Sequence, residues 1–418
     1  MKALVFGAGK IGSVAAWDLA RNRDVDAVGL VGRTASSLQA RREWIGSDKV
    51  ALHPLDIGQS EKVGRLMSGY DVGVITLPDR RSSYDVVRLA VEAGLDVVDV
   101  LEEYHRRPEP YETEGLQVPP GMSLDQFGED LHSRAKDGGV ALLDGMGFAP
   151  GLSNVTVGQG IRSMDRALGA TARVGGIPTR ESAARHPLRY MITWSFNHVL
   201  REYSVPVRVI SDGRVAEVPA TSGRETFRFQ RCGQDEELEC AITPGMPSFL
   251  YTRPQLRQFS EKTVRWPGHW QGVDLLKECG LLDLQPVDFN GALISPREFF
   301  LALVEPRLRP LPQDQDVCVM WNTVVGEKDG LPSRKDYYMW LDSDRERGIS
   351  AMARVTGFSA AVGAMLLGRG LIREKGILAP EDAIAGRLYR EFMQELSRRG
   401  VEVEEIQEEG SGGAEVVI

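Results

Sequence analysis

A glycine-rich turn directly after the first apolar run constrains the fold of this 418-residue chain more than any other feature. The turn follows strand-like residues 3–6, opens a helix over residues 12–21, and consists of Gly7, Gly9, Lys10, Ile11 and Gly12. Gly7 permits the tight turn, Gly9 lets the backbone approach a pyrophosphate, and Gly12 lets the helix pack on the strand. Free N–H groups at the start of the helix then bind the phosphates. The sequence therefore predicts a Rossmann unit that binds NAD(H) or NADP(H).

Apolar runs and amphipathic stretches alternate through the first third of the chain. Runs rich in Val, Leu and Ile predict strands at residues 3–6, 27–31, 72–77, 96–100 and 140–144, with a further strand-like run at 55–57. The amphipathic stretches between them predict helices at residues 12–21, 60–67 and 83–93. Continuous apolar strands separated by helices are typical of a parallel sheet covered on both faces. We therefore expect an α/β fold with a doubly wound parallel sheet.

The end of the second strand bears on the choice of dinucleotide. Rossmann units that bind NAD place an acidic residue here to hydrogen-bond the ribose hydroxyls, but this chain reads Gly32, Arg33 and Thr34. Arg33 can pair with a 2′-phosphate, and loss of the acid removes a repulsion against that group. The sequence therefore favours NADP(H) over NAD(H), with Arg33 and Thr34 as cofactor contacts. The alternative is that Arg33 is only a solvated surface charge.

Further candidate residues stand where the strands end. Ligands of open parallel sheets bind outside the carboxyl ends of the strands. Asp56 is expected to contact the adenine, and Leu77 and Pro78 the nicotinamide side of the cleft. Asp99 and Asp144 end two further strands, and we predict that they handle the proton of the substrate. The alternative for either aspartate is helix capping or turn formation.

The stretch from residue 101 to residue 128 interrupts this alternation. It is rich in Pro, Glu and Gly, most densely over residues 106–121. We interpret it as a surface loop outside the sheet. The alternative is a lid over the active site, because long loops in compact domains are often functional.

The character of the chain changes after residue 151. Strand-like segments at residues 205–210, 226–231 and 237–243 are separated by turn residues and predict a second, α+β domain with a mixed, mainly antiparallel sheet. Helices are expected at residues 350–368 and 383–399, and the acidic, Gly-rich tail is expected to be disordered. The predicted domains are a Rossmann domain at 1–150, a substrate-binding and dimerisation domain at 151–350, C-terminal helices at 351–401 that pack back on the Rossmann domain, and a disordered tail at 402–418.

Two polar clusters in the second domain are candidates for substrate contact. Trp194 and Ser195 combine a flat aromatic surface with a hydroxyl group. Arg265 and His269 lie on one short turn, which the Pro and Gly between them make rigid. Arginine suits bidentate recognition of a carboxylate, and histidine can transfer a proton. The alternatives are a structural ion pair for Arg265 and a structural histidine for His269.

Composition narrows the classes of function. The net charge of −9 argues against general binding to nucleic acids or anionic membranes, which require clustered positive charge. Since no apolar run is long enough to cross a bilayer, no membrane span is expected. The four cysteines show neither a CxxC pair nor metal-ligand spacing, so we expect reduced thiols, no bound metal and a cytoplasmic protein.

Five segments in order along the chain carry a family resemblance. They are GAGKIG at 7–12, DGMGFAPGLSN at 144–154, ITWSFNHVLREY at 192–203, EKTVRWPGH at 261–269 and ARVTGFSAA at 353–361. Together they resemble the saccharopine dehydrogenase-like oxidoreductases, and most closely the lysine 6-dehydrogenases among them. The resemblance implies a Rossmann domain, a mixed-sheet second domain that often forms the dimer interface, and a C-terminal helix that packs on the first domain. It places Asp144, Trp194, Ser195, Arg265 and His269 in the substrate-side motifs.

For activity, the resemblance implies a homodimer that carries out NAD(P)-dependent oxidation of a side-chain amine of a small amino acid, first of all L-lysine at its ε-carbon. Related members instead form or split secondary amines, as in saccharopine and carboxynorspermidine chemistry. Gly32-Arg33 replaces the acid of lysine dehydrogenase-like members, and the stretch after Leu101 is longer than usual in the family. A dinucleotide-binding regulator without catalysis is the alternative from another class, and the intact substrate-side motifs argue against it.

Overall fold

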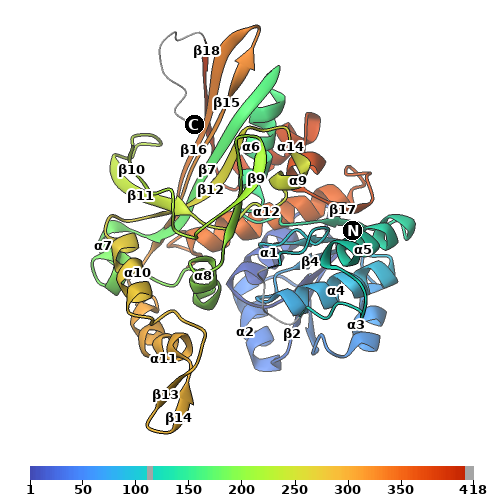
Figure 1. Cartoon of the computed structure of the whole chain (residues 1–418). Coiled ribbons are helices and arrows are strands. Elements are labelled where there is room, and N and C mark those ends of the chain that lie inside the picture. Colours follow the sequence, from blue (N-terminus) through green and yellow to red (C-terminus); the bar gives the residue numbers. More distant parts are fainter. Residues whose placement is uncertain (111–115, 410–418) are drawn as a thin grey trace. The chain divides into compact units, whose positions relative to one another are not determined.

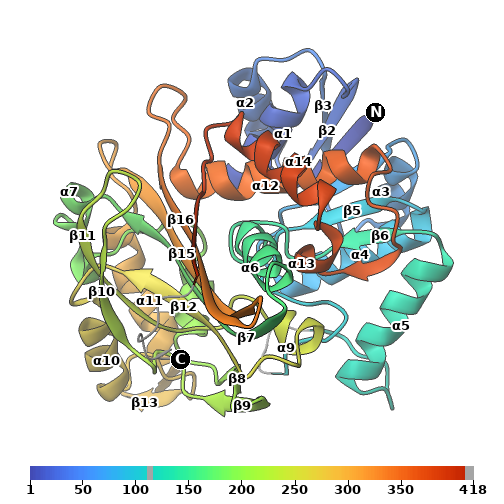
Figure 2. The ribbon, with the colours of Figure 1, turned by 90° about the horizontal axis from the view of Figure 1, so that it is seen from above.

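The computed structural model describes residues 1–110 and 116–409, and its ribbon is shown in Figures 1 and 2. The chain divides into two compact units. Unit 1 comprises Met1–Asp165, Gly245–Pro254 and Ala353–Glu402. Unit 2 comprises Arg166–Pro244, Gln255–Met352 and the chain from Val403 onward. The polypeptide therefore leaves unit 1 and returns to it twice, and the domain limits given above remain predictions.

Unit 1 is built on a seven-stranded sheet in which every strand runs parallel to its neighbours. Its strands are β1 (Lys2–Phe6), β2 (Ala27–Gly32), β3 (Val50–Pro54), β4 (Val72–Ile75), β5 (Asp96–Asp99), β6 (Ala141–Leu143) and β17 (Gly376–Leu378). The order is β17-β6-β5-β4-β1-β2-β3, so the sheet winds outward in both directions from β1. This confirms the predicted α/β fold with a doubly wound parallel sheet, whose switch point lies at the carboxyl end of β1.

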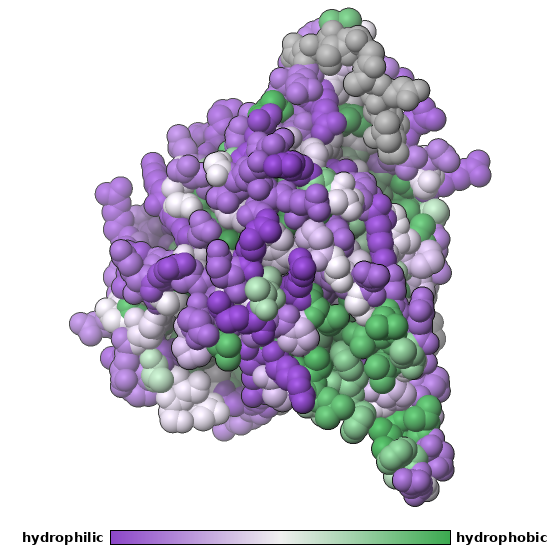
Figure 3. All heavy atoms as spheres, turned by 90° about the vertical axis from the view of Figure 1, so that its left-hand side faces the viewer, coloured by the Kyte–Doolittle hydropathy of each residue, from purple (hydrophilic) through white to green (hydrophobic). Residues whose placement is uncertain are grey.

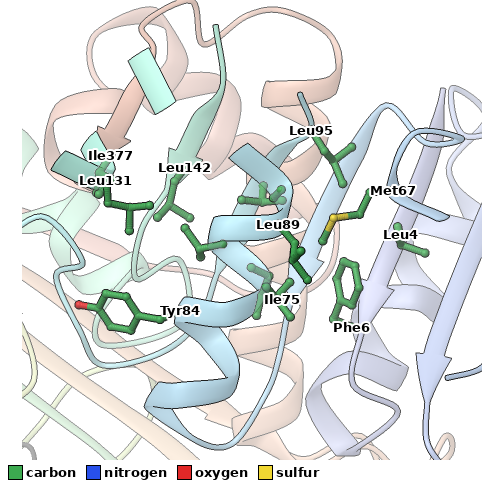
Figure 4. Packing of buried hydrophobic residues seen from close by; sticks show 14 of the residues in the cluster. Leu4, Phe6, Met67, Ile75, Tyr84, Leu89, Leu95, Leu131, Leu142 and Ile377 are labelled. Atoms are coloured by element: carbon green, nitrogen blue, oxygen red, sulfur yellow. The ribbon is translucent and has the colours of Figure 1, made fainter. Parts of the chain in front are cut away.

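Helices cover both faces of this sheet. The helices of unit 1 are α1 (Lys10–Arg21), α2 (Ala35–Ile45), α3 (Ser60–Met67), α4 (Arg80–Ala93), α5 (Leu124–Asp137), α6 (Leu152–Arg162), α9 (Phe249–Thr252), α12 (Ala351–Gly368), α13 (Pro380–Ala383) and α14 (Arg387–Ser397). Figure 4 shows side chains of β1, β4, β6 and β17 meeting those of α3, α4 and α5 in one buried cluster. Each large apolar side chain buried there stabilises the unit by about 1.5–3 kcal/mol.

Helix α12 lies on the opposite face of the sheet. A Cβ added at Gly363 would lie 3.0 Å from Leu143 Cδ2 of β6, and one at Gly357 would lie 2.9 Å from Val14 Cγ1 of α1. Glycine therefore allows the helix to approach the sheet and α1 closely. Within the described residues, α12 is the helix whose length and composition would allow a membrane crossing, but 83% of that stretch is buried inside the protein. Its apolar character is that of a core helix.

Two strand predictions for unit 1 differ from the structure. The third strand is β3, and residues 55–57, which were expected to form it, lie just beyond its end. β3 is an edge strand with a mixed pattern of burial, so its sequence carries a weak apolar signal. β17 was not expected at all, because its three residues join the sheet from the far end of the chain.

The stretch from residue 101 to residue 128 is not simply a surface loop. Leu101, Glu103, Tyr104 and His105 are buried, and α5 begins within the stretch at Leu124. The surface-loop prediction is therefore wrong for its first residues, which polar composition alone marks as exposed. Residues 111–115 lie outside the described residues, and the lid stays a prediction.

Unit 2 is built on a nine-stranded mixed sheet. Its strands are β7 (Arg166–Pro178), β8 (Val207–Ser211), β9 (Arg214–Val218), β10 (Glu225–Phe229), β11 (Glu236–Ile242), β12 (Gln258–Arg265), β15 (Asp316–Lys328), β16 (Leu331–Asp342) and β18 (Glu404–Glu409). The main order is β10-β11-β12-β7-β15-β16-β18, and only the β12–β7 pairing among the described strands of this sheet is parallel. The prediction of a mixed, mainly antiparallel second sheet is confirmed.

Shorter elements extend from this sheet. They are α7 (Arg180–Ala183), a 3₁₀ turn η1 (Pro187–Arg189), α8 (Phe196–Glu202), α10 (His269–Glu278), the hairpin β13 (Val287–Phe289) and β14 (Ala292–Ile294), and α11 (Pro296–Leu308). The prediction of a disordered tail is wrong for Glu404–Glu409, which pair with β16 as β18. A neighbouring strand can order an acidic segment that composition marks as unstructured. Residues 410–418 lie outside the described residues.

Candidate functional site

The glycine loop after β1 has the shape that a dinucleotide requires. Gly7 has a φ of 104° and its N–H donates to Val31 O at 3.1 Å, which closes the turn. A Cβ at Gly12 would lie 1.9 Å from Gly7 O, whereas a Cβ at Gly9 would meet no atom within 4 Å. The space beside Gly9, in front of the first turn of α1, therefore fits an approaching pyrophosphate.

The predicted cofactor contacts at the ends of β1 and β2 stand on neighbouring strands. Lys10 is exposed and Ile11 half-buried in the first turn of α1. Arg33 is exposed directly after β2, and Thr34 is the N-cap of α2 without a side-chain capping hydrogen bond. The adjacent strand ends thus present two cations and a hydroxyl group without an intervening acid, as a phosphorylated ribose would require.

The other predicted contacts follow β3 and β4. Asp56 is exposed, and its Oδ1 accepts a hydrogen bond from Gly58 N at 2.9 Å, so the carboxylate shapes the turn after β3. Leu77 is half-buried and Pro78 exposed after β4, the strand beside β1. Their position at the carboxyl edge of the sheet is the predicted one, and their contact with the cofactor stays a prediction.

Asp99 and Asp144 are brought together by a histidine that the sequence analysis did not single out. Asp144 Oδ1 lies 2.7 Å from His105 Nδ1, and Asp144 Oδ2 accepts from His105 N at 2.7 Å. On the other side of the ring, His105 Nε2 lies 2.9 Å from Ser83 Oγ, which donates to Asp99 Oδ2. These four side chains form a continuous chain of hydrogen bonds, called here the buried network; Asp144 is 2% exposed and the others are fully buried.

The charges of the network favour a protonated imidazole. Burial by itself lowers the pKa of His105, but the charge and hydrogen bond of Asp144, together with Asp99, outweigh burial and raise the pKa to about 9. Both ring nitrogens then donate, Nδ1 to Asp144 and Nε2 to Ser83. Burial also raises the pKa of the Asp99 carboxyl. The network therefore stores a proton near neutral pH and can release it at higher pH.

Neighbouring side chains hold the network in place. The ring of Tyr84 lies over that of His105, with centroids 4.3 Å apart. Tyr84 also donates to Glu103 Oε1 at 3.2 Å, and Glu103 forms a two-point ion pair with Arg80, with N–O distances of 2.9 and 3.0 Å. A buried pair of this geometry fixes the segment after β5 against α4. The one sequence signal for His105 was its place, six residues after the strand that ends in Asp99.

In unit 2, Arg265 lies in a buried aromatic setting. Its Nε donates to Tyr203 Oη at 2.9 Å and its Nη1 to Val264 O at 3.0 Å, while Tyr190 and Tyr203 stack beside the guanidinium. Nη2 has no hydrogen-bond partner among the residues that the structure describes. Arg265 therefore retains one donor group for a ligand.

His269 contacts Tyr203, the residue that accepts the hydrogen bond from Arg265. Its Nδ1 donates to Leu188 O at 2.9 Å, so in the neutral ring its Nε2 accepts from Tyr203 Oη at 3.0 Å. Burial, and then the charge of Arg265, lower the pKa of His269 to about 3. At neutral pH the ring is uncharged and both nitrogens are occupied, which suits a positioning residue rather than a proton carrier.

Trp194 and Ser195 stand at the start of α8. Trp194 is half-buried against an apolar cluster, and its ring lies 5.7 Å from that of His198. Ser195 is half-buried and is the N-cap of α8, but its side chain makes no capping hydrogen bond. Unit 2 thus holds the predicted substrate contacts, and unit 1 holds the buried network.

Two buried acids in unit 2 escaped the sequence analysis. Glu202, at the end of α8, is 3% exposed and its Oε1 has no hydrogen-bond partner in the described part of the chain. Glu261 accepts from Thr243 Oγ1 at 2.8 Å, and burial, followed by the charge of Glu202, raises its pKa well above the ordinary value. Glu202 interacts electrostatically with both Arg265 and Glu261, and Arg265 also interacts with Glu261. A buried carboxyl oxygen without a hydrogen-bond partner is costly, which makes Glu202 a candidate position for a cationic group.

Metal chemistry receives no support from residue placement. Across residues 1–110 and 116–409, no group of three or more His, Cys, Asp or Glu side chains is arranged to hold a metal ion. None of the four cysteines forms a disulfide within the described residues, and two are exposed and two buried.

Comparison with known proteins places both units in one family. The family model for the saccharopine dehydrogenase NADP binding domain matches residues 3–143, and that for the saccharopine dehydrogenase C-terminal domain matches residues 147–401. Carboxyaminopropylagmatine dehydrogenase of Synechocystis sp. is 23% identical over 400 residues, which cover 91% of this chain and 92% of the relative. The NADP-dependent, L-glutamate-forming saccharopine dehydrogenase of Pyricularia oryzae is 21% identical over 358 residues, covering 69% and 76%.

The fold agrees with this assignment. The apo L-glutamate-forming saccharopine dehydrogenase of Saccharomyces cerevisiae superposes with a TM-score of 0.75 at 19% identity, over 97% of this chain and 99% of that one. The two family models match in order and together span almost all of the described residues. The chain therefore belongs to the saccharopine dehydrogenase family of NAD(P)-dependent oxidoreductases.

Proposed function

We propose that this protein is an NADP(H)-dependent dehydrogenase that forms or splits a secondary amine between an amino-acid-derived aldehyde and a small amine. The observation that carries the proposal is the buried network at the same edge of the sheet as the glycine loop. The relatives support the substrate class, since the names of both denote secondary amines that carry carboxylate groups.

The proposed reaction requires the transfer of one proton to or from the amine nitrogen of the substrate. Condensation of an amine with an aldehyde releases water and leaves an imine, which is then reduced to the secondary amine. When bound, the nicotinamide supplies or accepts the hydride at the carbon of this C–N bond. In the oxidative direction the amine must first lose its proton, because only a neutral amine can donate its lone pair; in the reductive direction the nitrogen gains a proton.

We propose that the buried network handles this proton. His105 holds it at Nε2, Ser83 links that nitrogen to Asp99, and Asp144 orients the ring and raises its pKa. Since these groups are shielded from bulk water, the proton stays available for the substrate. This assignment keeps the predicted acids Asp99 and Asp144 and adds His105 between them.

The charged groups of unit 2 suit a substrate that is both acidic and basic. The free Nη2 of Arg265 would bind a carboxylate, and Tyr203 with His269 would hold the guanidinium in position. Glu202 would bind the cationic end of the amine, and Trp194 would provide an apolar wall. Binding at both ends would orient the C–N bond for reaction.

For the cofactor, we propose NADP(H) rather than NAD(H), with Gly7, Gly9 and Gly12 around the pyrophosphate. Arg33, Thr34 and Lys10 would bind the 2′-phosphate side, and Asp56, Leu77 and Pro78 the rest of the dinucleotide. The name of the matching N-terminal family model supports this preference.

Oxidation of L-lysine at its ε-carbon is the second candidate. The segments that resemble lysine 6-dehydrogenases include Trp194 and Arg265, and the same proton chemistry serves a primary amine. A cytoplasmic homodimer likewise stays a prediction.

A panel of substrate pairs tests the proposal. Aspartate semialdehyde with agmatine, and 2-aminoadipate semialdehyde with L-glutamate, should each be tested for NADPH consumption at 340 nm. With at least one of the two pairs, we expect NADPH to be consumed about tenfold faster or more than with the aldehyde alone, because the amine is the second substrate. Turnover of L-lysine with NADP or NAD, combined with inactivity of both pairs, would replace the proposal by the second candidate.

Replacement of Arg33 tests the cofactor preference. Arg33→Ser should raise the KM for NADP(H) by about 10–100-fold, because it removes one charge-assisted hydrogen-bonding partner of the 2′-phosphate. The KM for NAD(H) should stay unchanged. Arg42→Ser, an exposed arginine in the last turn of α2, is the matched control and should leave both values as they are. Equal effects on the two cofactors would contradict the assignment.

The pH dependence tests the buried network. In the oxidative direction the rate should rise with pH, reach half of its plateau at about pH 9 and level off above that, because His105 must be neutral to take up a proton. Asp144→Asn removes the carboxylate that raises this pKa, so the rise should move to lower pH as well as lose amplitude. Glu92→Gln, which alters an exposed acid of α4, should leave the profile unchanged. A profile that is identical in Asp144→Asn and the wild type would remove the network from the mechanism.

Replacement of Glu202 tests substrate recognition. Glu202→Gln should raise the KM for the cationic amine about tenfold or more, with little change for the aldehyde, because a hydrogen bond to a charge is lost. The thermal midpoint should change little, because Glu202 Oε1 has no hydrogen-bond partner in the described part of the chain that the substitution could remove. Glu217→Gln, an exposed acid of β9, is the control. A large loss of stability with unchanged KM would mark Glu202 as purely structural.

A further inference from the structure

Unit 1 contains a charged cavity that shares no lining residue with the glycine loop or the buried network. The cavity measures about 920 Å³ and lies between the end of α1, the end of α12 and one side of α14 (Figure 2). A volume of this size admits a small-molecule ligand. All eleven lining residues are polar or charged, and six of them are arginines. These are Arg21, Arg23, Arg369, Arg387, Arg390 and Arg398, and the cavity is called here the arginine cavity.

The sign of the charge sets the arginine cavity apart from the rest of the surface. Hydrophilic side chains cover most of the face of the molecule in Figure 3, so a charged surface alone marks no site. In the cavity, however, six arginines meet only three acids, Asp24, Glu391 and Glu395, although the net charge of the chain is −9. The cavity therefore has an excess of positive charge, which attracts an anion.

The three acids of the cavity are already paired with arginines. Asp24 Oδ2 accepts a hydrogen bond from Arg369 Nη2 at 2.5 Å, and Glu391 Oε1 lies 3.8 Å from Arg369 Nη1. Glu395 forms an ion pair with Arg398. The carboxylates are thus committed to two of the six arginines, and the positive charge of the others is not neutralised by an acid that lines the cavity.

Three arginines of the cavity are available to a ligand. Arg23, Arg387 and Arg390 are exposed, and their guanidinium groups form no hydrogen bond or ion pair within residues 1–110 and 116–409. On α14, Arg387, Arg390, Gln394 and Arg398 follow one another at spacings of three or four residues and so lie along one side of the helix. The row spans roughly 16 Å at 1.5 Å per residue. It is longer than a single phosphate group and can be covered by a chain of phosphates.

Interactions with neighbouring groups hold the walls of the cavity in place. Arg399 Nε donates to both oxygens of Asp18 in α1, at 2.8 and 2.9 Å, and Arg399 Nη1 donates to Glu395 Oε2 at 2.7 Å. Asp18 is 6% exposed, so this pairing fixes the end of α14 against α1. The guanidinium of Arg21 lies over the ring of Trp17, 4.1 Å from its centroid. Because the walls are fixed beforehand, an anion can bind without a large ordering cost.

We propose that the arginine cavity binds a linear polyphosphate, such as the triphosphate chain of a nucleotide. Guanidinium groups bind phosphate oxygens through paired, charge-assisted hydrogen bonds. No lining residue is apolar, so the cavity recognises the phosphate chain rather than a base. The site is distinct from the dinucleotide site, because the glycine loop opens α1 and the cavity lies at the other end of that helix. This inference is independent of the proposed chemistry.

Calorimetric titration of the full-length protein tests the site, with NADPH at saturation so that the dinucleotide loop is occupied. Tripolyphosphate and ATP should each bind once per chain at 0.15 M salt, where long-range attraction between exposed charges is screened. The double variant R387S/R390S should weaken binding by about tenfold or more, because two charge-assisted hydrogen-bonding partners are lost. The matched control R65S/R134S removes two exposed arginines of α3 and α5 and should bind like the wild type.

Further measurements separate the site from diffuse attraction and from loss of folding. Tighter binding of ATP than of tripolyphosphate would identify a nucleotide as the ligand, and equal affinities the phosphate chain alone. The substituted side chains are exposed, so R387S/R390S should keep the thermal midpoint and the NADPH affinity of the wild type. R23S alters another wall of the cavity and should weaken binding about fivefold. Absence of binding in the wild type, unchanged affinity in R387S/R390S, or an equal loss in both double variants would overturn the proposal.

Discussion

The two hydrogen bonds between Asp144 and His105 are the interaction on which the carboxyl edge of the dinucleotide-binding sheet depends. They join the end of β6 to the segment that follows β5, and they place a charged ring between two buried carboxylates. Burying these charges is costly, and only their mutual pairing makes it tolerable. Removal of either partner would leave an uncompensated charge in the core, so the position of this edge and the charge state of His105 are linked.

This arrangement gives the two acids different tasks. Asp144 uses both oxygens on His105, whereas Asp99 also accepts from Leu101 N at 2.8 Å and so shapes the turn after β5. The turn-forming alternative considered for these aspartates therefore coexists with the network at Asp99. An acid that orients a histidine through both oxygens is a poor direct base, so we assign the exchangeable proton to the ring in the proposed function.

The buried polar groups of unit 2 differ from the network of unit 1, because their hydrogen bonding is incomplete. Around Arg265 the aromatic rings and the neutral His269 supply a rigid frame, and none of the residues that the structure describes forms a hydrogen bond with Nη2. Within residues 1–110 and 116–409, Glu202 Oε1 likewise lacks a hydrogen-bond partner. Groups that are buried and incompletely paired are normally avoided in a protein interior, and a ligand that completes them gains affinity from that deficit.

Local sequence patterns determined much of unit 1. The glycine loop, the short apolar strands and the acids that end β5 and β6 could be predicted, because turn geometry and strand burial act over a few neighbouring residues. The family segments likewise marked Trp194 and Arg265 as candidate substrate contacts. Tertiary structure alone decided that β17 joins the sheet. It also decided that the Pro- and Glu-rich stretch places His105 beside Asp144, which is 39 residues away in the sequence. In unit 2 it decided that His269 is uncharged and that Glu202 Oε1 is buried without a hydrogen-bond partner among the described residues. Charge state and burial depend on groups brought together from distant parts of the chain, and no local pattern records that proximity.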